Sequence, residues 1–270
     1  MGLFSLFSQS LAKEKYIFFD VETTGLFPLC GDKILEIAMI KVDGGEIVDK
    51  FESMFNPQIK ISEEITNING ITNEMVKDSP VFSKDIGNDI IKFIEDTTLV
   101  AHNAAFDLGF LSTEMARVGI TFDGWRSIDS LKIATSIFPG QKNKLESLMK
   151  RYNIEQKGDL HRAYNDTIIL KDVFFQLLDE TEIRGKTFDN ILNKYGFKGI
   201  ILPRSVPFTI KEAMIEKRAI FGKYKKRNGE IIEINFKPIA PVWVEKRWFI
   251  FGEDTDEKKF VTISGDNWLS

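Results

Sequence analysis

The sequence predicts an α/β domain with a mixed sheet flanked by helices, followed by a small module that is mainly β. Three strand-like segments with short connections open the chain, which indicates antiparallel pairing, and a further strand then alternates with helical segments. Beyond residue 182 the pattern changes to short extended runs joined by turns. Hydrophobic residues make up 43% of the 270 residues and include 23 Phe, so both parts have material for a buried core.

The strands of the front half are predicted from apolar runs bounded by turn residues, such as Gly44 and Gly45. These strands span residues 16–22, 34–42, 47–55 and 98–101. Helices are predicted where apolar residues recur every three or four positions, as at Phe82, Ile86 and Ile90. The helices of the front half are expected over residues 62–68, 81–94, 106–118, 131–137, 145–152 and 163–178.

The back half is predicted as two short helices and a β-rich module. Thr209 is expected to cap the second helix, and Asn228-Gly229, between two extended runs, is a strong hairpin signal. The helices span residues 188–195 and 209–216, a linker spans 202–207, and the strands span 219–226, 230–236, 247–251 and 259–263. The expected organisation is a tail at 1–14, an α/β domain at 15–182, a helix and linker at 183–208, and the β-rich module at 209–270.

Charge is divided unevenly along the chain. The net charge is −4, but residues 184–270 contain 17 basic and 11 acidic residues, a net charge of +6, and the part before them carries −10. An acidic front half is expected if clustered carboxylates there are neutralised by bound cations, and a basic back half can contact phosphates. A solvated basic face is the alternative explanation of the surplus.

Several classes of protein are excluded. The single cysteine, Cys30, excludes an intramolecular disulfide framework and a Cys-rich zinc site, and it is expected to be a small buried residue. No segment approaches the roughly 18 unbroken apolar residues of a membrane span, so no membrane partner is expected. A cytoplasmic location fits this use of cysteine.

Three segments carry acidic side chains that could form one cluster. Asp20 and Glu22 are two residues apart at the end of an apolar strand, so their side chains share one face. Two carboxylates aimed together repel each other unless a cation or a proton lies between them. Asp107 begins a helix after a strand and a turn, and Asp166 lies on a helix with His161 five residues earlier. Such a set of oxygen ligands suits phosphodiester hydrolysis with two metal ions.

These three segments resemble, in order, the three motifs of the DEDDh exonucleases. Residues 137–148 also resemble the epsilon proofreading subunits of bacterial DNA polymerase III. The resemblance covers about residues 15–180 and implies a ribonuclease H-like fold, with His161 as the general base. The ligands that it implies for two Mg²⁺ or Mn²⁺ ions are Asp20, Glu22, Asp107 and Asp166.

The resemblance also implies contacts with the substrate. Leu26 matches a residue that wedges against the terminal base, and Thr23 matches one that contacts the terminal nucleotide through its backbone. Asn69 stands where many relatives have a histidine, and His102 is expected mainly to orient the turn between strand and helix. The expected substrate-binding residues are Thr23, Leu26, Asn69, His102 and Phe106.

The resulting expectation is a 3′–5′ exonuclease that releases nucleoside 5′-monophosphates from a nucleic acid, with DNA favoured over RNA. Its expected substrate is a single-stranded or frayed 3′ end, and a DNA polymerase bound in trans is a candidate partner in proofreading or repair. Two alternatives stay open: an exoribonuclease with the same motifs, and a nucleic-acid-binding regulator with a vestigial exonuclease fold. All five catalytic positions are filled, which argues against the second.

Residues 210–263 resemble a WYL domain, a small β-rich module of bacteria linked with nucleic-acid or ligand sensing. The three-letter signature appears as Trp248-Phe249-Ile250, with its second and third letters substituted. As a hypothesis, this module presents basic side chains to a nucleic-acid backbone, with Trp248 available for stacking. The basic residues are Lys223, Lys225, Lys226, Arg227 and Arg247. The alternative is that they only keep a hairpin soluble.

Overall fold

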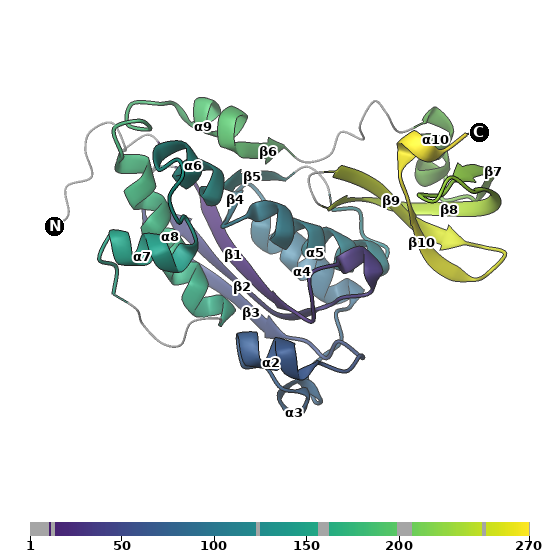
Figure 1. Cartoon of the computed structure of the whole chain (residues 1–270), viewed down its shortest axis with the longest axis horizontal. Helices are drawn as coiled ribbons and strands as arrows, with labels where there is room; N and C mark the ends of the chain where they lie inside the picture. The colour runs from purple at the N-terminus through teal and green to yellow at the C-terminus, as the bar shows by residue number, and fades with distance from the viewer. Residues whose placement is uncertain are drawn as a thin grey trace.

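The chain folds into two units, each built around one β-sheet (Figure 1). The computed structural model describes residues 11, 14–122, 125–155, 162–198, 207–244 and 247–269. The first unit contains the acidic motifs and the second contains most of the basic C-terminal part. This division into an α/β unit and a smaller β unit confirms the expected fold class.

The first sheet is mixed, as expected. Its strands are β1 (Tyr16–Thr23), β2 (Ile34–Asp43), β3 (Glu46–Met54), β4 (Thr98–Ala101), β5 (Arg126–Asp129) and β6 (Gly196–Lys198). In the described part of the chain they lie in the order β3-β2-β1-β4-β5-β6. β1, β4 and β5 are parallel and the remaining pairs are antiparallel. The carboxyl ends of three parallel strands therefore meet at one edge of the sheet.

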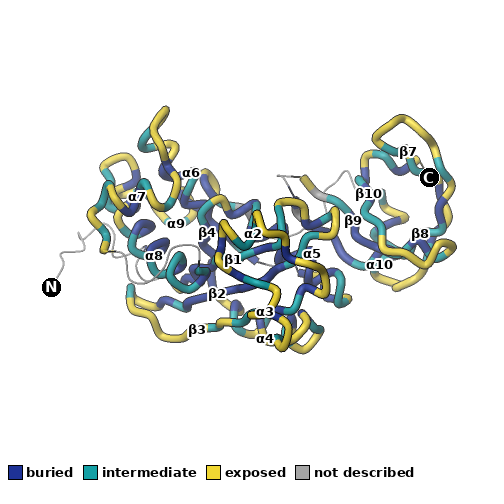
Figure 2. The backbone as a smooth tube through the Cα atoms, turned by 60° about the horizontal axis from the view of Figure 1, so that its bottom comes forward, coloured by how far each residue is buried: buried dark blue, intermediate teal, exposed yellow. Residues whose placement is uncertain are grey.

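Helices cover both faces of this sheet (Figures 1 and 2). They are α2 (Glu63–Asn69), α3 (Asn73–Val76), α4 (Lys84–Ile94), α5 (Ala104–Arg117), α6 (Ser130–Ile137), α7 (Leu145–Arg151), α8 (Ala163–Asp179) and α9 (Phe188–Tyr195), with a 3₁₀ helix η1 (Pro28–Cys30). Among the residues that the structure describes, no helix has the length and the apolar character that crossing a membrane requires.

The side chains of β1 alternate between the two helical layers, because successive residues of a strand point to opposite faces. Tyr16 and Phe18 each lie 5.4 Å, centroid to centroid, from the ring of Phe174 on α8. Ile17 and Phe19 belong instead to the core formed with α4 and α5. The side chains of these first four residues of β1 are all 0% exposed. β1 is therefore the central strand of a three-layer unit.

The structure differs from expectation in short elements and boundaries. The sequence does not predict α3, β5 or β6, since three or four residues are too few to show a period. α4 begins at Lys84, later than expected, because the side chain of Ser83 caps it. Beyond the expected domain boundary at residue 182, β6 pairs with β5, and Ile191 of α9 is buried in the core of the first unit. The first unit therefore continues to Lys198.

The second unit is an antiparallel sheet with one described α-helix, α10 (Phe208–Ile215). Its strands are β7 (Ile220–Lys225), β8 (Ile231–Val244), β9 (Arg247–Asp254) and β10 (Lys259–Ile263), in the order β10-β9-β8-β7, followed by a 3₁₀ helix η2 (Gly265–Asn267). The expected turn at Asn228-Gly229 is confirmed: Gly229 has a φ of 89°, and Lys226 N donates to Glu230 O at 2.7 Å.

Two expectations about this unit are wrong. Thr209 does not cap α10, because the helix begins at Phe208 and Pro207 occupies the N-cap position. β8 runs well past its expected end at residue 236, although proline cannot donate to a β ladder. A register shift beside Pro238 accommodates the proline inside the strand. Residues 202–206 of the expected linker lie outside the described residues.

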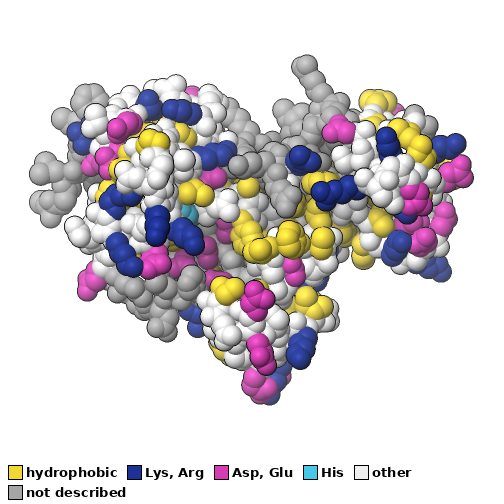
Figure 3. All heavy atoms as spheres, in the orientation of Figure 1, with side chains coloured by type: hydrophobic (Ala, Val, Ile, Leu, Met, Phe, Trp, Pro, Cys, Tyr) yellow, Lys and Arg dark blue, Asp and Glu magenta, His cyan; other side chains and the backbone are white. Residues whose placement is uncertain are grey.

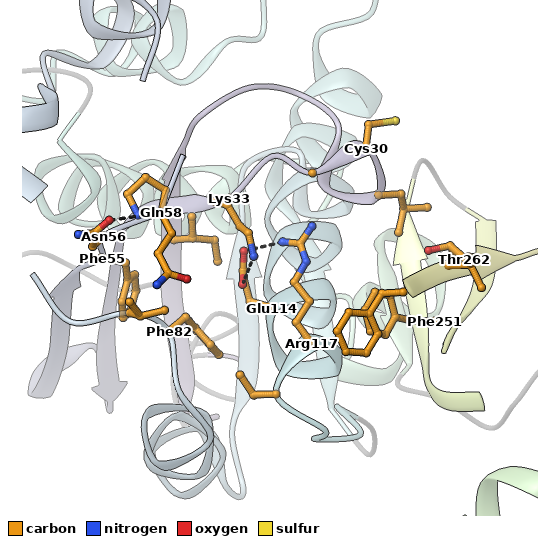
Figure 4. Close-up of a pocket in the computed structure, with 18 of the residues that line it drawn as sticks. Cys30, Lys33, Phe55, Asn56, Gln58, Phe82, Glu114, Arg117, Phe251 and Thr262 are labelled. Atoms are coloured by element: carbon orange, nitrogen blue, oxygen red, sulfur yellow. Dashed lines mark hydrogen bonds and ion pairs between the residues drawn. The ribbon is translucent and has the colours of Figure 1, made fainter. Parts of the chain in front are cut away.

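The two units meet along α5. Ala116 of α5 packs with Ala240 and Val242 of β8 and with Phe251 of β9 in one buried cluster. Figure 3 shows apolar side chains gathered in a band across this junction. A cavity of about 730 Å³ lies beside the cluster, between η1, α5 and the second sheet (Figure 4).

The cavity at the junction is lined by a group of paired charges. Lys33 Nζ lies 3.7 Å from Glu114 Oε2, and Arg117 Nη1 lies 2.7 Å from Glu114 Oε1 (Figure 4). Cys30 also lines the cavity and is exposed, contrary to the expected burial. The reason is the orientation of η1, which buries Pro28 and turns Cys30 outward.

The expected N-terminal tail is anchored at one described residue, Leu11. Its side chain is 1% exposed in the core on the α8 side of the sheet, and its carbonyl accepts a hydrogen bond from the Tyr16 hydroxyl at 2.8 Å. Residues 1–10, 12 and 13 lie outside the described residues.

Candidate metal centre

Two carboxylates continue one face of β1 to the end of the strand. Asp20 and Glu22 follow Tyr16 and Phe18 in the same alternation, so they point toward the layer of α8 rather than toward α5. Both acids are half-buried. The apolar residues before them are fixed in the core, which sets the register of the strand and with it the direction of both carboxylates.

Asp166 joins this pair from the first turn of α8. One carboxylate oxygen from each of Asp20, Glu22 and Asp166 lies within 4.8 Å of the others. The positive end of the helix dipole favours an anion in the first turn of a helix. The structure thus brings together three of the four expected ligands in one cluster.

Asp107 lies beside the cluster, in the first turn of α5. Asn103, with a φ of 73°, turns the chain from β4 into this helix. The Oδ1 atom of Asp107 accepts a hydrogen bond at 3.3 Å from the backbone N of Val21, the residue between Asp20 and Glu22. This hydrogen bond ties Asp107 directly to the strand that carries the other acids. The side chain of Asp107 is 3% exposed.

The carboxylates of the cluster repel one another when they are ionised. Burial and the neighbouring carboxylates of Asp166 and Glu36 raise the pKa of Glu22 to about 8. Burial, followed by the charges of Asp107 and Glu22, raises the pKa of Asp20 well above its ordinary value. Burial also raises the pKa of Asp107. A site in which several acids resist ionisation in this way is stabilised by a cation placed among them.

The donor set fits a hard divalent cation. The four candidate side chains offer only carboxylate oxygens, which Mg²⁺ and Mn²⁺ prefer, whereas zinc sites usually contain nitrogen or sulfur ligands. Three of the oxygens already converge. The side chains that would hold the metal are Asp20, Glu22, Asp107 and Asp166.

Glu36 and Arg162 are functional candidates that no motif reveals. Glu36 lies opposite Glu22 in the register of β1 and β2 and is 8% exposed. Its carboxylate accepts hydrogen bonds from Arg162 Nη2 at 2.8 Å and Nε at 3.2 Å, and from Ala163 N at 3.1 Å. These bonds fix the start of α8, the helix that carries Asp166. The partners are 126 residues apart, so no local pattern signals the contact.

His161, the expected general base, lies outside the described residues. Its neighbour in the chain, Arg162, is described and is bound by Glu36. The catalytic role of His161 therefore stays a prediction from the motif.

Asn69, the last residue of α2, contacts the cluster and also the backbone of Thr23. A hydrogen bond from Asn69 to Glu22 lowers the pKa of Glu22, opposing the effect of burial. Asn69 is 4% exposed; its Nδ2 lies 3.5 Å from Thr23 O, and its Oδ1 accepts from Ile71 N at 3.0 Å. Thr23 Oγ1 donates to Gly25 O at 2.6 Å. Contacts of these two residues with a substrate stay a prediction.

His102 is bonded within the protein through both ring nitrogens. Nε2 donates to Asn143 O at 2.8 Å, and Nδ1 lies 2.9 Å from Ser130 Oγ. Burial lowers the pKa of His102. Asp129 supports the same turn, because its Oδ1 accepts from Asn103 N at 3.1 Å and it caps α6. These bonds support an orienting role for His102.

Leu26, expected to wedge against the terminal base, and Phe106, expected to bind the substrate, line the same hollow. Leu26 is 66% exposed and its neighbour Phe27 is 54% exposed. A hollow of about 500 Å³ is lined by these residues, by Phe106 and by Val244 of β8. Adjacent apolar side chains left this exposed often mark a binding surface. Because Val244 belongs to β8, the second unit contributes to the wall of this hollow.

The basic residues predicted to contact nucleic acid do not form one surface. Four of them lie in β7 and in the turn that follows: Lys223, Lys225, Lys226 and Arg227. Two of these pair with glutamates across the hairpin, Lys223 at 3.7 Å and Lys226 at 3.1 Å. Arg247 and Trp248 begin β9, next to the opposite end of β8, which is a strand of 14 residues. The hairpin lysines and Arg247 therefore lie at opposite ends of the sheet.

Comparison with known proteins places the first unit among the exonucleases. A DNA polymerase III subunit epsilon of Rickettsia prowazekii is 39% identical over 184 residues, which cover 66% of this chain and 78% of that protein. A DNA polymerase III of the PolC type from Bacillus cereus is 36% identical over 198 residues, which cover 73% of this chain but 14% of that protein. The chain thus corresponds to a small part of the PolC-type relatives.

Solved structures show the same fold. Exonuclease X in complex with 5′ overhanging duplex DNA has a TM-score of 0.51 at 27% identity, covering 66% of this chain and 98% of that chain. The nuclease domain of 3′hExo, a DEDDh family member bound to rAMP, has a TM-score of 0.55 at 16% identity, covering 64% and 95%. The family RNase_T, described as exonuclease, matches residues 17–174. Because this match takes in more than half of the 270 residues, the chain belongs to the RNase_T exonuclease family.

Proposed function

We propose that the chain is a metal-dependent 3′–5′ exonuclease of the DEDDh type that releases nucleoside 5′-monophosphates, with DNA as its preferred substrate. The observation that carries the proposal is the convergence of Asp20, Glu22 and Asp166 beside Asp107, in a member of an exonuclease family. Exposed acidic groups are common without function. Here the acids are half-buried or buried, and mutual repulsion adds to the rise in the pKa of Asp20 and Glu22.

In this mechanism Asp20, Glu22, Asp107 and Asp166 would hold two Mg²⁺ or Mn²⁺ ions, which would activate the attacking water and neutralise charge on the leaving 3′ oxygen. The chain fixes the four carboxylates through β1, α5 and α8, so they need no rearrangement during the reaction. His161 takes the proton of the water, because its ordinary pKa of about 6.5 suits a general base near neutral pH. Leu26 wedges against the terminal base and Phe106 contacts the substrate beside it, which places the scissile phosphate against the acids.

DNA is favoured as the substrate because the relatives from R. prowazekii and B. cereus are DNA polymerase III proteins. A DNA polymerase bound in trans is the proposed partner, in proofreading or repair, since the epsilon relative is by name a subunit of one. The second unit, with its resemblance to a WYL domain, is proposed to bind nucleic acid. Residues 207–270 contain 12 basic and 10 acidic residues, and this small basic surplus supports this part of the proposal.

The test is degradation of 5′-labelled single-stranded DNA and RNA of one sequence, with Mg²⁺, Mn²⁺ or EDTA. We expect a ladder that shortens from the 3′ end only when metal is present, and faster on DNA. Asp20→Asn should lower the rate by about 100- to 1,000-fold, because it removes one preorganised charge. Asp49, exposed on β3, provides the control: Asp49→Asn removes the same charge away from the cluster and should leave the rate unchanged.

Each outcome of this assay selects one function. A ladder that forms faster on RNA would make the chain an exoribonuclease. If neither polymer shortens with either metal, the exonuclease proposal fails. Retained binding of the labelled strands in a gel-shift assay would then favour a nucleic-acid-binding regulator with a vestigial exonuclease fold.

A further inference from the structure

α5 connects the metal centre to the second unit. Its first turn carries Asp107, which is bonded to β1. Near its other end, Ala116 packs against Ala240, Val242 and Phe251 of the second sheet. Because one helix is fixed in both places, the second sheet has a defined position relative to the acids.

This position brings the end of β8 to the side of the first unit where the substrate is proposed to bind. Val244, the last residue of β8, is 9% exposed and lines the hollow of about 500 Å³ opposite Leu26 and Phe106. Phe106 directly precedes the candidate ligand Asp107 in the chain. The wall of the hollow therefore runs from the residue next to a candidate ligand to the second unit.

The hollow has the chemistry of a nucleobase site. Its described lining consists of apolar, aromatic and small residues, with no charged side chain, and Asn103 adds one amide group. A nucleobase has flat faces that stack on such walls and polar edges that an amide can recognise. A second protein segment is a weaker candidate, because Phe106 of the hollow directly precedes Asp107, one of the acids that are proposed to act on the nucleic acid.

An exposed cation lies next to the hollow. Arg247 begins β9 and is the register partner of Val244. The described salt bridges of the second unit involve other cations. Arginine is well suited to bind a phosphate, because its guanidinium can donate two parallel hydrogen bonds.

We propose that the hollow holds the base of the nucleotide that precedes the terminal one, and that Arg247 contacts the phosphate on the 5′ side of that nucleotide. The inference rests on the proposed exonuclease function and makes the second unit a wall of the substrate site. It also defines the substrate: the last two nucleotides of the 3′ end must be unpaired, since a base that enters the hollow cannot remain in a duplex.

Substrates of graded length test this inference, each with Mg²⁺ or Mn²⁺. The 4-nitrophenyl ester of thymidine 5′-phosphate has no penultimate base and reports only on the metal centre and the contacts of the terminal nucleotide. A dinucleotide adds that base, and a single-stranded decamer adds the phosphate beyond it. Val244→Asp should raise KM on the order of tenfold for the dinucleotide and the decamer but not for the ester. Arg247→Gln should raise KM for the decamer alone and should lower the slope of log KM against log salt by about 0.7.

Two further variants separate the site from general effects. Lys258 is an exposed cation in the turn at the other end of β9, and Lys258→Gln should leave all three substrates unchanged. Because Val244 is buried, an acid there can disturb the sheet; Val244→Thr keeps the shape of the side chain and should still raise KM for the dinucleotide. If Val244→Thr and Arg247→Gln both have the KM of the wild type, the inference is wrong, while the proposed exonuclease function is unaffected. A wild-type chain inactive on all three substrates would overturn the proposed function and the inference with it.

Discussion

The carboxylate of Glu36 ties β2 to the start of α8. It is 8% exposed and accepts two hydrogen bonds from the Arg162 guanidinium and one from Ala163 N. Paired charge-assisted bonds of this kind are both strong and directional. Removing one partner leaves a charge without compensation in a largely buried place. Glu36 is therefore a positioning residue for Asp166, through the first turn of α8.

We predict that Glu36→Gln lowers kcat by about 10- to 100-fold with little change in KM, because supporting residues of metal sites typically have effects of this size. Steady-state kinetics on the decamer would measure both constants. Arg162→Met should have a similar effect, and the double variant Glu36→Gln/Arg162→Met should be no worse than either single one. Multiplied losses in the double variant, or a shift of the pH profile with an unchanged plateau, would contradict the positioning role.

Residues of the cluster could be predicted where local spacing carries the signal. Asp20 and Glu22 share a strand face by their two-residue separation, and this requires no knowledge of the fold. Glu36 could not be identified, because its partner comes from a distant segment. The residue type of Cys30 predicts burial, but its exposure depends on how η1 is oriented against α5, which composition does not specify.

Among the elements, the loop between β1 and β2 is held by hydrogen bonds rather than by a buried core. Its residues Leu26 and Phe27 are exposed. Asp32 Oδ2 accepts from Phe27 N at 2.8 Å, and Arg117 of α5 donates to Asp32 O at 3.1 Å. The loop that is expected to wedge against the terminal base is thus positioned by the same helix that carries Asp107.

The prediction for this loop concerns Gly25. A Cβ atom at this position would lie 2.3 Å from Asp32 Oδ2, so Gly25→Ala must displace the carboxylate from Phe27 N. Losing one hydrogen bond of about 1 kcal/mol should raise KM for the decamer about fivefold, with kcat nearly unchanged. Asp32→Ala should give the same increase, and the double variant should add nothing. A double variant that is much weaker than either single one would show that the two residues act separately.

Long elements could be predicted because their periodicity is local, as in β1, β2 and α8, whereas short ones depend on the partner they meet. β6 has three residues and exists because it pairs with β5. Gly196 permits this close approach, since a Cβ atom there would lie 2.5 Å from Ser127 O. The length of β8 also depends on context, because a register shift in its pairing with β9 accommodates Pro238 inside the strand.

For the whole molecule, the acidic cluster couples stability to pH and to metal. The ordinary pKa of a glutamate, 4.5, applies to Glu22 in the unfolded chain, and in the folded state the pKa is raised to about 8. Between these values the folded state binds the proton that the unfolded state has lost. Stability must therefore fall as pH rises through this window and level off above it. Asp20 and Asp107 act in the same direction, since the pKa of each is also raised.

We therefore expect the Tm of the wild-type chain in EDTA to fall between about pH 4.5 and 8 more steeply than the Tm of Glu22→Gln, which cannot ionise. Titrating groups outside the cluster contribute equally to both proteins, so the difference between the two melting curves isolates the ionisation of Glu22 and its effect on the neighbouring acids. Mg²⁺ binds the ionised, folded site and should stabilise the wild type most above this window, by about 2.7 kcal/mol at a concentration about a hundred times Kd. Asp49→Asn should follow the wild type throughout. Parallel pH curves for wild type and Glu22→Gln in EDTA would mean that the carboxylates are not in mutual conflict, and the physical argument for a cation among them would fall.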